Sequence, residues 1–269
     1  MAENTTEINR SFFNDEASTY DSKHGKLLER LIQELQARRD WIGVDWADGD
    51  DSAEEDDEHL DDIQSKSTEA KKEVRLLDYA CGTGMISRAL APYTTQCIGI
   101  DVSENMVAAY NSRAENQGLS QQEMHAVIGD LLTPQPTGNL SEPDFFGFDL
   151  AAVGGGFHHF ADPEQASVRL VKRLRPGGVL LIWDFLPHGP RSGNDAAHYG
   201  VMHHGLSEER VRNMFEQAGA GTGFALEVIG THTLPNSHQH GQRGHAHGGE
   251  DHAGPAARHI FFARGQKAA

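Results

Sequence analysis

The chain has few of the features that mark several large classes of protein. Only two of its 269 residues are cysteines, Cys81 and Cys97, and both fall in segments that we expect to be buried, which excludes a disulfide framework. The densest apolar run, 179–183, is far too short to cross a bilayer, and no signal-peptide core is present. Positive charge is scarce, since 23 Lys and Arg against 40 Asp and Glu leave a net charge of −17. We therefore expect a protein of the cytoplasm or nucleus that binds neither membranes nor nucleic acids.

Most of the excess negative charge lies in one segment. Eleven acidic residues occur between positions 45 and 62, where there is no Lys or Arg. Such a run cannot bury an apolar face, so 43–72 is predicted to be a disordered, solvated insertion. It is either a plain spacer or a docking segment for a basic protein partner, such as a histone tail.

A second insertion, 235–255, is rich in glycine and histidine. We expect it to be a flexible loop between two strands at 225–233 and 259–263. Histidine pairs of this spacing bind Zn²⁺ adventitiously, but no cysteine accompanies them, so no physiological metal site is predicted. The histidines of this segment are His238, His240, His245, His247 and His252.

A glycine-rich turn follows the apolar run 74–79 and lacks two features of common nucleotide-binding loops. Ser87 stands where the dinucleotide fingerprint has its third glycine, and no Lys follows the glycines as it does in a P-loop. Gly82 and Gly84 still let the backbone approach a ligand, and the helix expected after them points unpaired N–H groups at it. The acid just before the turn, Asp78, suits a ligand that carries positive charge. The ligand that combines a nucleoside with an ammonium and a sulfonium is S-adenosylmethionine.

Two further predicted strands end in acids. Residues 96–101 end in Asp101, and 124–128 are followed by Asp130. Ligands of open α/β sheets bind at the carboxyl edge, so we expect these acids to line one site, with Asp101 accepting hydrogen bonds from ribose hydroxyls. Ser103 is expected to cap the next helix. Strands and helices alternate through the chain, which predicts a doubly wound, mostly parallel α/β sheet. The later elements are strands at 149–153 and 179–185 and helices at 163–174 and 207–218, the last capped by Ser207.

In their order and spacing these motifs resemble those of class I S-adenosylmethionine-dependent methyltransferases, closest to the small-molecule branch typified by ubiquinone-biosynthesis C-methyltransferases. The matching segments are Leu77–Gly84, Gly99–Met106, Gly129–Leu131, Phe148–Leu150, Leu174–Leu180 and the N-terminal Ala17–Asp21. The resemblance implies a Rossmann-like sheet of seven strands with an antiparallel C-terminal hairpin, built from 73–269. Residues 1–42 would form a helical lid in which Tyr20 closes over the cofactor. One departure is Ala80, where the family usually has glycine.

The resemblance also assigns roles around the cofactor. Asp78 would help to hold the methionyl ammonium, Asp101 the ribose and Asp130 the adenine amino group. Met106 would cover the adenine, and Leu131 would pack on the ring. The full set expected to bind the cofactor is Tyr20, Asp78, Ala80, Gly82, Gly84, Asp101, Val102, Met106, Asp130 and Leu131.

Methyl transfer from a sulfonium asks little acid–base chemistry of the protein. It is an in-line displacement, so the protein must mainly align the acceptor and exclude water. A base is needed only when the acceptor's proton must leave early. Histidine is suited to that task, and for each candidate the alternative is a purely structural role. The candidates are His158 and His159, which follow the fourth strand and lie beside the sulfonium in this fold, and then His203 and His204 on a later linker, with Tyr199 and Met202 nearby.

The segment after the fourth strand bears on the class of methyl acceptor. Gly154–Phe157 stands where enzymes that methylate amino groups of nucleic acids or glutamine carry Asn-Pro-Pro-Tyr or Asp-Pro-Pro-Tyr. A small organic acceptor, methylated on oxygen, carbon or nitrogen, is therefore the leading hypothesis. The alternatives are a protein methyltransferase within a heteromeric complex and a catalytically silent interaction subunit, which would carry a damaged glycine-rich turn.

Overall fold

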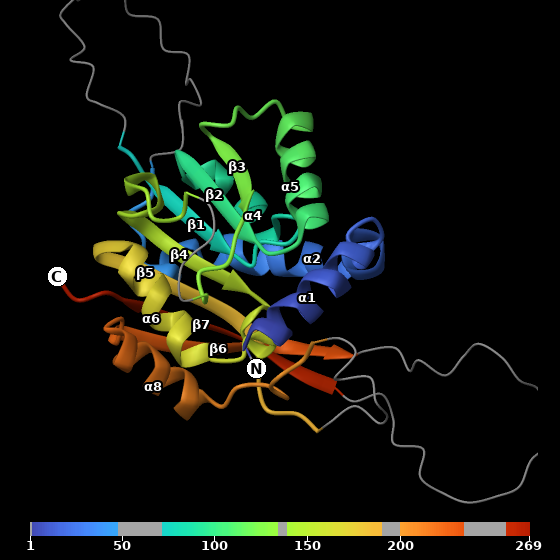
Figure 1. Cartoon of the computed structure of the whole chain (residues 1–269). Helices are drawn as coiled ribbons and strands as arrows, with labels where there is room; N and C mark the ends of the chain where they lie inside the picture. The colour runs from blue at the N-terminus through green and yellow to red at the C-terminus, as the bar shows by residue number, and fades with distance from the viewer. Residues whose placement is uncertain (1, 48–71, 134–138, 190–199, 234–256) are drawn as a thin grey trace, which may run out of the picture.

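The computed structural model describes residues 2–47, 72–133, 139–189, 200–233 and 257–269, and its core is one sheet of seven strands (Figure 1). The strand order is β3-β2-β1-β4-β5-β7-β6, with β7 antiparallel to both of its neighbours and the other pairs parallel. This confirms the expected doubly wound sheet with its antiparallel C-terminal hairpin. The strands are β1 Arg75–Tyr79, β2 Gln96–Asp101, β3 Met124–Ile128, β4 Phe148–Gly154, β5 Leu174–Phe185, β6 Thr222–Thr233 and β7 Ala257–Gln266.

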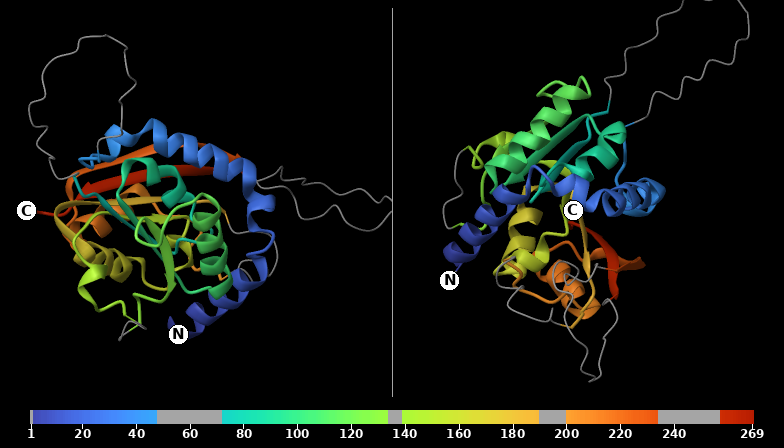
Figure 2. Two further views of the ribbon diagram at one scale, coloured as in Figure 1. Left: turned by 90° about the horizontal axis from the view of Figure 1, so that it is seen from above. Right: turned by 90° about the vertical axis from the view of Figure 1, so that its right-hand side faces the viewer.

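Helices cover both faces of the sheet (Figure 2). Apolar side chains of α2, α4 and α5 pack on one face, and those of α6 and α8 pack on the other. Because both faces are buried, the central strands are continuous apolar runs, as is usual for parallel sheets. The helices are α1 Ala2–Glu16, α2 Tyr20–Ala37, α3 Arg39–Ile42, α4 Met85–Leu90, α5 Glu104–Asn116, α6 Pro163–Arg173 and α8 Glu208–Ala218, with short 3-10 turns at Ala91–Tyr93, Pro143–Phe145 and Phe157–His159.

Local capping chemistry explains where the helices begin. Ser103 Oγ accepts a hydrogen bond from Met106 N at 3.1 Å, and Ser207 Oγ accepts one from Arg210 N at 3.2 Å, which confirms both expected N-caps. The strand β5 starts five residues before its predicted beginning, because Leu174 already pairs with Phe148 ahead of a bulge. Strand pairing there overrides the turn signal of the glycines that come after it.

The N-terminal part is helical, as expected, and its two long helices lie in different places. The α2 helix packs on α4 behind the sheet, whereas α1 lies across the edge toward which the β4 arrow points in Figure 1. Both insertions fall mainly outside the described residues, since 48–71 and 234–256 are not among them. None of the described helices combines the length and apolar character that crossing a bilayer requires.

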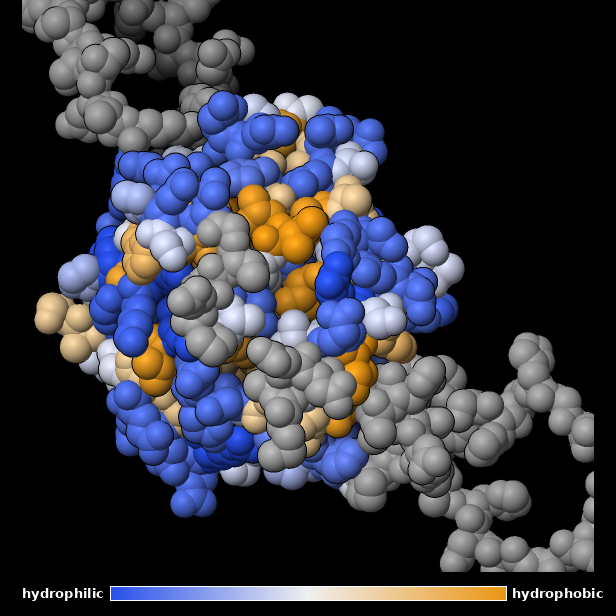
Figure 3. Space-filling view, viewed as in Figure 1, coloured by the Kyte–Doolittle hydropathy of each residue, from blue (hydrophilic) through white to orange (hydrophobic). Residues whose placement is uncertain are grey.

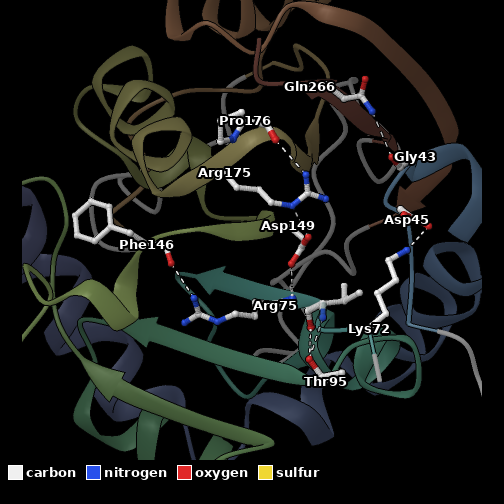
Figure 4. Close-up of polar contacts among 11 residues, drawn as sticks. Gly43, Asp45, Lys72, Arg75, Thr95, Phe146, Asp149, Arg175, Pro176 and Gln266 are labelled. Carbon is white, nitrogen blue, oxygen red and sulfur yellow. Dashed lines mark hydrogen bonds and ion pairs between the residues drawn. The ribbon is translucent and has the colours of Figure 1, made fainter. Parts of the chain in front are cut away.

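Large apolar side chains are mostly buried in the described residues, and the face in Figure 3 is largely hydrophilic, with hydrophobic areas separated by blue ones. At the amino edge of the sheet, polar contacts join the strands (Figure 4). Asp149 Oδ2 accepts a hydrogen bond from Arg75 N at 2.8 Å, and Asp149 Oδ1 pairs with Arg175 Nε at 2.6 Å. Arg75 Nη1 in turn donates to the Phe146 carbonyl at 2.8 Å. These contacts tie β1, β4 and the start of β5 together.

Candidate active site

A cavity of about 370 Å³ lies at the carboxyl edge of the sheet, where open α/β sheets bind ligands. Its floor comes from the segments that follow β1, β2, β3 and β4, and one wall comes from α1. Seven of the residues expected to bind the cofactor line it: Tyr20, Ala80, Gly82, Asp101, Val102, Met106 and Asp130.

Asp101 connects the end of β2 to the glycine-rich turn. Its Oδ2 accepts a hydrogen bond from Gly82 N at 2.8 Å, and its Oδ1 accepts one from Ser103 N at 2.9 Å. Burial raises the pKa of this carboxyl, whose residue is only 7% exposed. Each oxygen still has accepting capacity, because a carboxylate offers about four lone-pair positions in all.

Asp130 is surrounded by neutral donors. Its Oδ1 accepts hydrogen bonds from Tyr79 Oη at 3.0 Å and from Leu132 N at 2.7 Å. Its Oδ2 accepts one from Thr6 Oγ1 at 3.1 Å, which connects α1 to the end of β3. Burial raises the pKa of Tyr79 well above its ordinary value, so the phenol remains a hydrogen-bond donor. Neither Tyr79 nor Thr6 was identified from the sequence.

The turn after β1 contains an unusual backbone conformation. Ala80 has φ of 54°, the only left-handed conformation of a non-glycine residue in the described part of the chain. Gly82 shares this region with φ of 51°, and a Cβ atom at Gly82 would meet nothing within 4 Å. The turn is therefore strained at Ala80 and open at Gly82, a combination that is found at ligand sites.

Three expected cofactor ligands, Asp78, Gly84 and Leu131, do not line the cavity. Asp78 is 1% exposed and turns to α4, where its Oδ2 accepts hydrogen bonds from Ser87 N at 3.1 Å and Ser87 Oγ at 2.8 Å. Gly84 is packed, since a Cβ there would lie 2.7 Å from the Tyr110 ring. Leu131 is buried in the core, and the next residue, Leu132, lines the cavity instead.

The two histidines after β4 differ in their surroundings. His159 lines the cavity, its Nδ1 lies 3.2 Å from the Gly200 carbonyl, and burial lowers its pKa to about 3. His158 does not line the cavity, and its Nδ1 pairs with Asp184 Oδ1 at 2.8 Å. Burial alone would raise the pKa of Asp184, but the His158 ring and hydrogen bonds from the backbone N–H groups of Phe185 and His158 hold that pKa below its ordinary value. Asp184 was not identified from the sequence.

The linker histidines do not line the cavity. His203 Nε2 donates to the Phe160 carbonyl at 3.1 Å, and His203 Nδ1 accepts from Arg210 Nη1 at 3.3 Å. Burial and the Arg210 charge lower the pKa of His203. Both ring nitrogens are thus engaged in holding the linker, which contradicts a role for His203 as a base. His204 packs on the ring of His188 at 5.9 Å, and Tyr199 lies outside the described residues.

The described residues contain no group of three or more His, Cys, Asp and Glu arranged to hold a metal ion. The histidine-rich segment 235–255 lies wholly outside the described residues.

Known proteins share both the sequence and the fold of this chain. The model of a methyltransferase domain matches residues 77–180. An uncharacterized methyltransferase of Schizosaccharomyces pombe, C1347.09, is 33% identical over 177 residues, which are 63% of this chain and 61% of that protein. The demethylmenaquinone methyltransferase of Thermus thermophilus is 33% identical over 115 residues, which are 42% and 48% of the two chains. The chain thus spans about half to three fifths of these relatives.

Residues 77–180 thus belong to the methyltransferase class of domains. Solved structures show the same fold, among them YcgJ of Bacillus, with a TM-score of 0.52 at 20% identity over 73% of this chain and 93% of that one. A methyltransferase of Haloferax volcanii, solved with the Trm112 activator, has a TM-score of 0.57 at 14% identity over 97% and 98% of the chains. S-adenosylmethionine is the cofactor of this class.

The cavity of this methyltransferase domain fits that cofactor. S-adenosylmethionine carries one net positive charge, and the carboxylates of Asp101 and Asp130 line the cavity without a cationic partner of their own among the described residues. The open side of Gly82 leaves room for a ligand against the backbone. The cavity thus fits the cofactor both by the negative charge of Asp101 and Asp130 and by the open space beside Gly82.

Proposed function

We propose that this protein is an S-adenosylmethionine-dependent methyltransferase that acts on a small organic acceptor. The observation that carries the proposal is the position of α1, which forms one wall of the cavity through Thr5, Thr6, Asn9 and Phe13. A covered cavity of about 370 Å³ suits small ligands. A protein acceptor would have to reach the methyl group past this helix.

The bound cofactor would supply the activated methyl carbon and its own leaving group, so this chain's residues have to bind, orient and exclude water. Asp101 would accept hydrogen bonds from the ribose hydroxyls, and Asp130 would accept one from the adenine amino group. Met106 and Tyr20 would cover the cofactor from α5 and α2. Met106 is an apolar side chain and is 1% exposed. Burial raises the pKa of Tyr20 to about 12, so its phenol is neutral near pH 7.

Two alternatives have weaker support. A protein methyltransferase that uses the acidic segment as a docking element depends on 45–62, most of which lies outside the described residues. A silent subunit would have a damaged cofactor site, whereas the contact between Gly82 and Asp101 is intact. Relatives named as demethylmenaquinone and ubiquinone-biosynthesis methyltransferases favour a small acceptor.

The cofactor site can be tested by isothermal titration with S-adenosylhomocysteine. We expect Asp101→Ala to weaken binding by about tenfold or more, because ribose donors would lose a charged acceptor in a buried site. Asp144→Ala is the matched control, since Asp144 is exposed at the opposite edge of the sheet. Equal affinity of Asp101→Ala and the unmodified protein would contradict the site.

The acceptor class can be tested with methyl-labelled S-adenosylmethionine and fractionated cell extract. Label in the small-molecule fraction that persists after deletion of 45–62 is the expected result. Label confined to protein, and lost with that deletion, would favour the docking alternative.

A further inference from the structure

The cavity has carboxylates but no cation among its described lining residues. Glu7, Asp101, Asp130 and Asp162 contribute to its wall, and no Lys or Arg does so within the described part of the chain. The cofactor compensates for one unit of this charge. A second ligand that carried phosphate or carboxylate would therefore enter a negative field without a counter-charge, which is costly in a buried site.

Guanidinium groups on neighbouring elements leave Asp101 and Asp130 without a counter-charge, although Arg10 Nη1 lies 3.5 Å from Oε2 of Glu7 and so balances the outer carboxylate of the wall. Arg10 of α1 pairs with Glu104, and Arg210 of α8 pairs with Glu164 at 2.7 Å. Arg169 of α6 donates to the carbonyl groups of Leu131 and Thr133. Each cation would have to give up these contacts before it reached an anionic acceptor.

His159 offers one well-defined polar group to this cavity. The Gly200 carbonyl can only accept, so Nδ1 of His159 carries the hydrogen of their 3.2 Å contact, and Nε2 keeps a lone pair. The buried polar atoms that lack a partner in the described residues are Asn9 Oδ1, Tyr110 Oη, Trp183 Nε1 and Arg264 Nε. Since His159 Nε2 is not one of them and none of the described residues bonds it, it is accessible to a ligand.

Aromatic side chains lie beside the His159 ring, whose Nε2 can accept a hydrogen bond. The Phe13 ring of α1 lies 5.2 Å from the His159 ring in an edge-on arrangement, and Phe160 is the next residue in the chain. Both phenylalanines line the cavity. These two rings carry no polar group that would compete for a hydrogen-bond donor brought to Nε2. The His158 ring, 4.2 Å away, has its Nδ1 engaged by Asp184.

We propose that the methyl acceptor is an uncharged or cationic molecule with an apolar body and a hydroxyl or amine group that donates a hydrogen bond to His159 Nε2. This inference rests on the proposed function and narrows its substrate class. Anionic acceptors are rejected by the carboxylates, and acceptors without a donor group leave Nε2 unpaired. Because burial lowers the pKa of His159 to about 3, the imidazole orients the acceptor as a neutral group near pH 7.

The test uses methyl-labelled S-adenosylmethionine, the full chain and cell extract, and it passes the labelled small molecules over an anion exchanger at pH 8. Unreacted S-adenosylmethionine also passes the exchanger, so the labelled product is first separated from it by reversed-phase chromatography, and we then expect the product label in the unretained fraction. The substitution His159→Phe should lower the rate of labelling by about tenfold or more, because the hydroxyl or amine group of the bound methyl acceptor would then be buried without a hydrogen-bond partner. His159→Gln, which restores an accepting oxygen, should recover part of the rate, and His125→Phe, on the edge strand β3, should leave it unchanged.

Titration of each variant with S-adenosylhomocysteine shows whether the cofactor site is intact, so a failure of this inference can be told apart from a failure of the proposed methyltransferase function. Label retained by the exchanger, or labelling by His159→Phe at the unmodified rate, would overturn the inference while the methyltransferase function stood. A complete lack of label with the unmodified protein would overturn both. The tautomer of His159 can be measured without any reaction. ¹⁵N NMR should show a neutral ring protonated at Nδ1 from pH 5 to 8, and a protonated Nε2 would contradict the assignment.

Discussion

The carboxylate at the amino edge of the sheet and the carboxylates near the ends of β1, β2 and β3 at the carboxyl edge have opposite kinds of partner, whereas Asp184 near the end of β5 pairs with His158. At the amino edge, Asp149 pairs with the Arg175 guanidinium and with the backbone N–H of Arg75 (Figure 4). At the carboxyl edge, Asp78, Asp101 and Asp130 have hydroxyl and backbone N–H groups as their hydrogen-bond partners, and no ion pair reaches them within the described residues.

This difference in hydrogen-bond partners indicates that the amino edge has a structural role and that the carboxyl edge is suited to binding. An ion pair with good hydrogen bonds occupies a carboxylate, whereas neutral donors hold it in place and leave its charge uncompensated. Asp101 and Asp130 therefore give the cavity at the carboxyl edge a negative potential that suits a cationic cofactor, and burial without an ion pair costs stability there. Variants of one carboxylate at each edge test this contrast.

The largest effect is expected at Asp78. Burial raises its pKa to about 7, whereas its ordinary value is 3.8, so between these values the folded state holds a proton that the unfolded state has lost. Stability from this group falls as pH rises through that range, by an amount on the order of 2–4 kcal/mol. Asp78→Asn should remove the loss, so its free energy of unfolding relative to the unmodified protein should increase from pH 4 to pH 8.

Urea unfolding at several pH values measures that difference. Comparing the variant with the unmodified protein cancels other titrating groups, among them His159, whose lowered pKa gives a slope of opposite sign between pH 3 and 6.5. A difference that does not change with pH would show that Asp78 is ionised at low pH, like an ordinary carboxylate.

Asp149 should behave as a structural carboxylate. Asp149→Ala leaves the Arg75 N–H without its partner and breaks the pair with Arg175, which should destabilise the protein by about 2 kcal/mol. Affinity for S-adenosylhomocysteine should stay within about twofold under conditions where the variant is folded. Equilibrium unfolding and calorimetric titration measure the two quantities. A large loss of affinity without loss of stability would erase the distinction between the edges.

The smallest effect is expected at Ala80, where the binding edge carries backbone strain. Ala80→Gly should stabilise the protein by about 0.5–1 kcal/mol, because glycine adopts a φ of 54° without the clash of a Cβ atom and loses part of this gain to its greater freedom when unfolded. The melting temperature should rise by about 1–4 °C. Ala114→Gly in α5 is the matched control and should destabilise. A lower melting temperature for Ala80→Gly would show that the turn is not strained.

Much of the fold was predictable because it depends on local patterns. Apolar runs ending in acids located β1 and β2 to within a residue, and the N-caps Ser103 and Ser207 marked two helix starts. The position of Asp101 at the cavity was predictable for the same reason, since parallel strands bring their carboxyl ends to one edge.

The errors concern the direction of single side chains. Leu131 and Leu132 are neighbours with opposite placements, one in the core and one at the cavity, and the sequence offers two leucines without a sign of which faces the ligand. The sequence could not show that both ring nitrogens of His203 are engaged, because their partners, the Phe160 carbonyl and Arg210, come from other elements of the fold. The wall formed by α1 was likewise unexpected in detail, since the contact between Thr6 and Asp130 joins residues 124 positions apart.

The sequence by itself determined the fold class, the order of the strands' acids and the class of cofactor, because these depend on hydrophobic periodicity and on the spacing of glycines and carboxylates along the chain. The tertiary structure decided which acids reach the cavity, that Asp78 turns to α4 instead, and that His159 rather than His203 lines the cavity. The physical reason is that hydrogen-bond partners for a buried side chain are chosen among groups that only folding brings together.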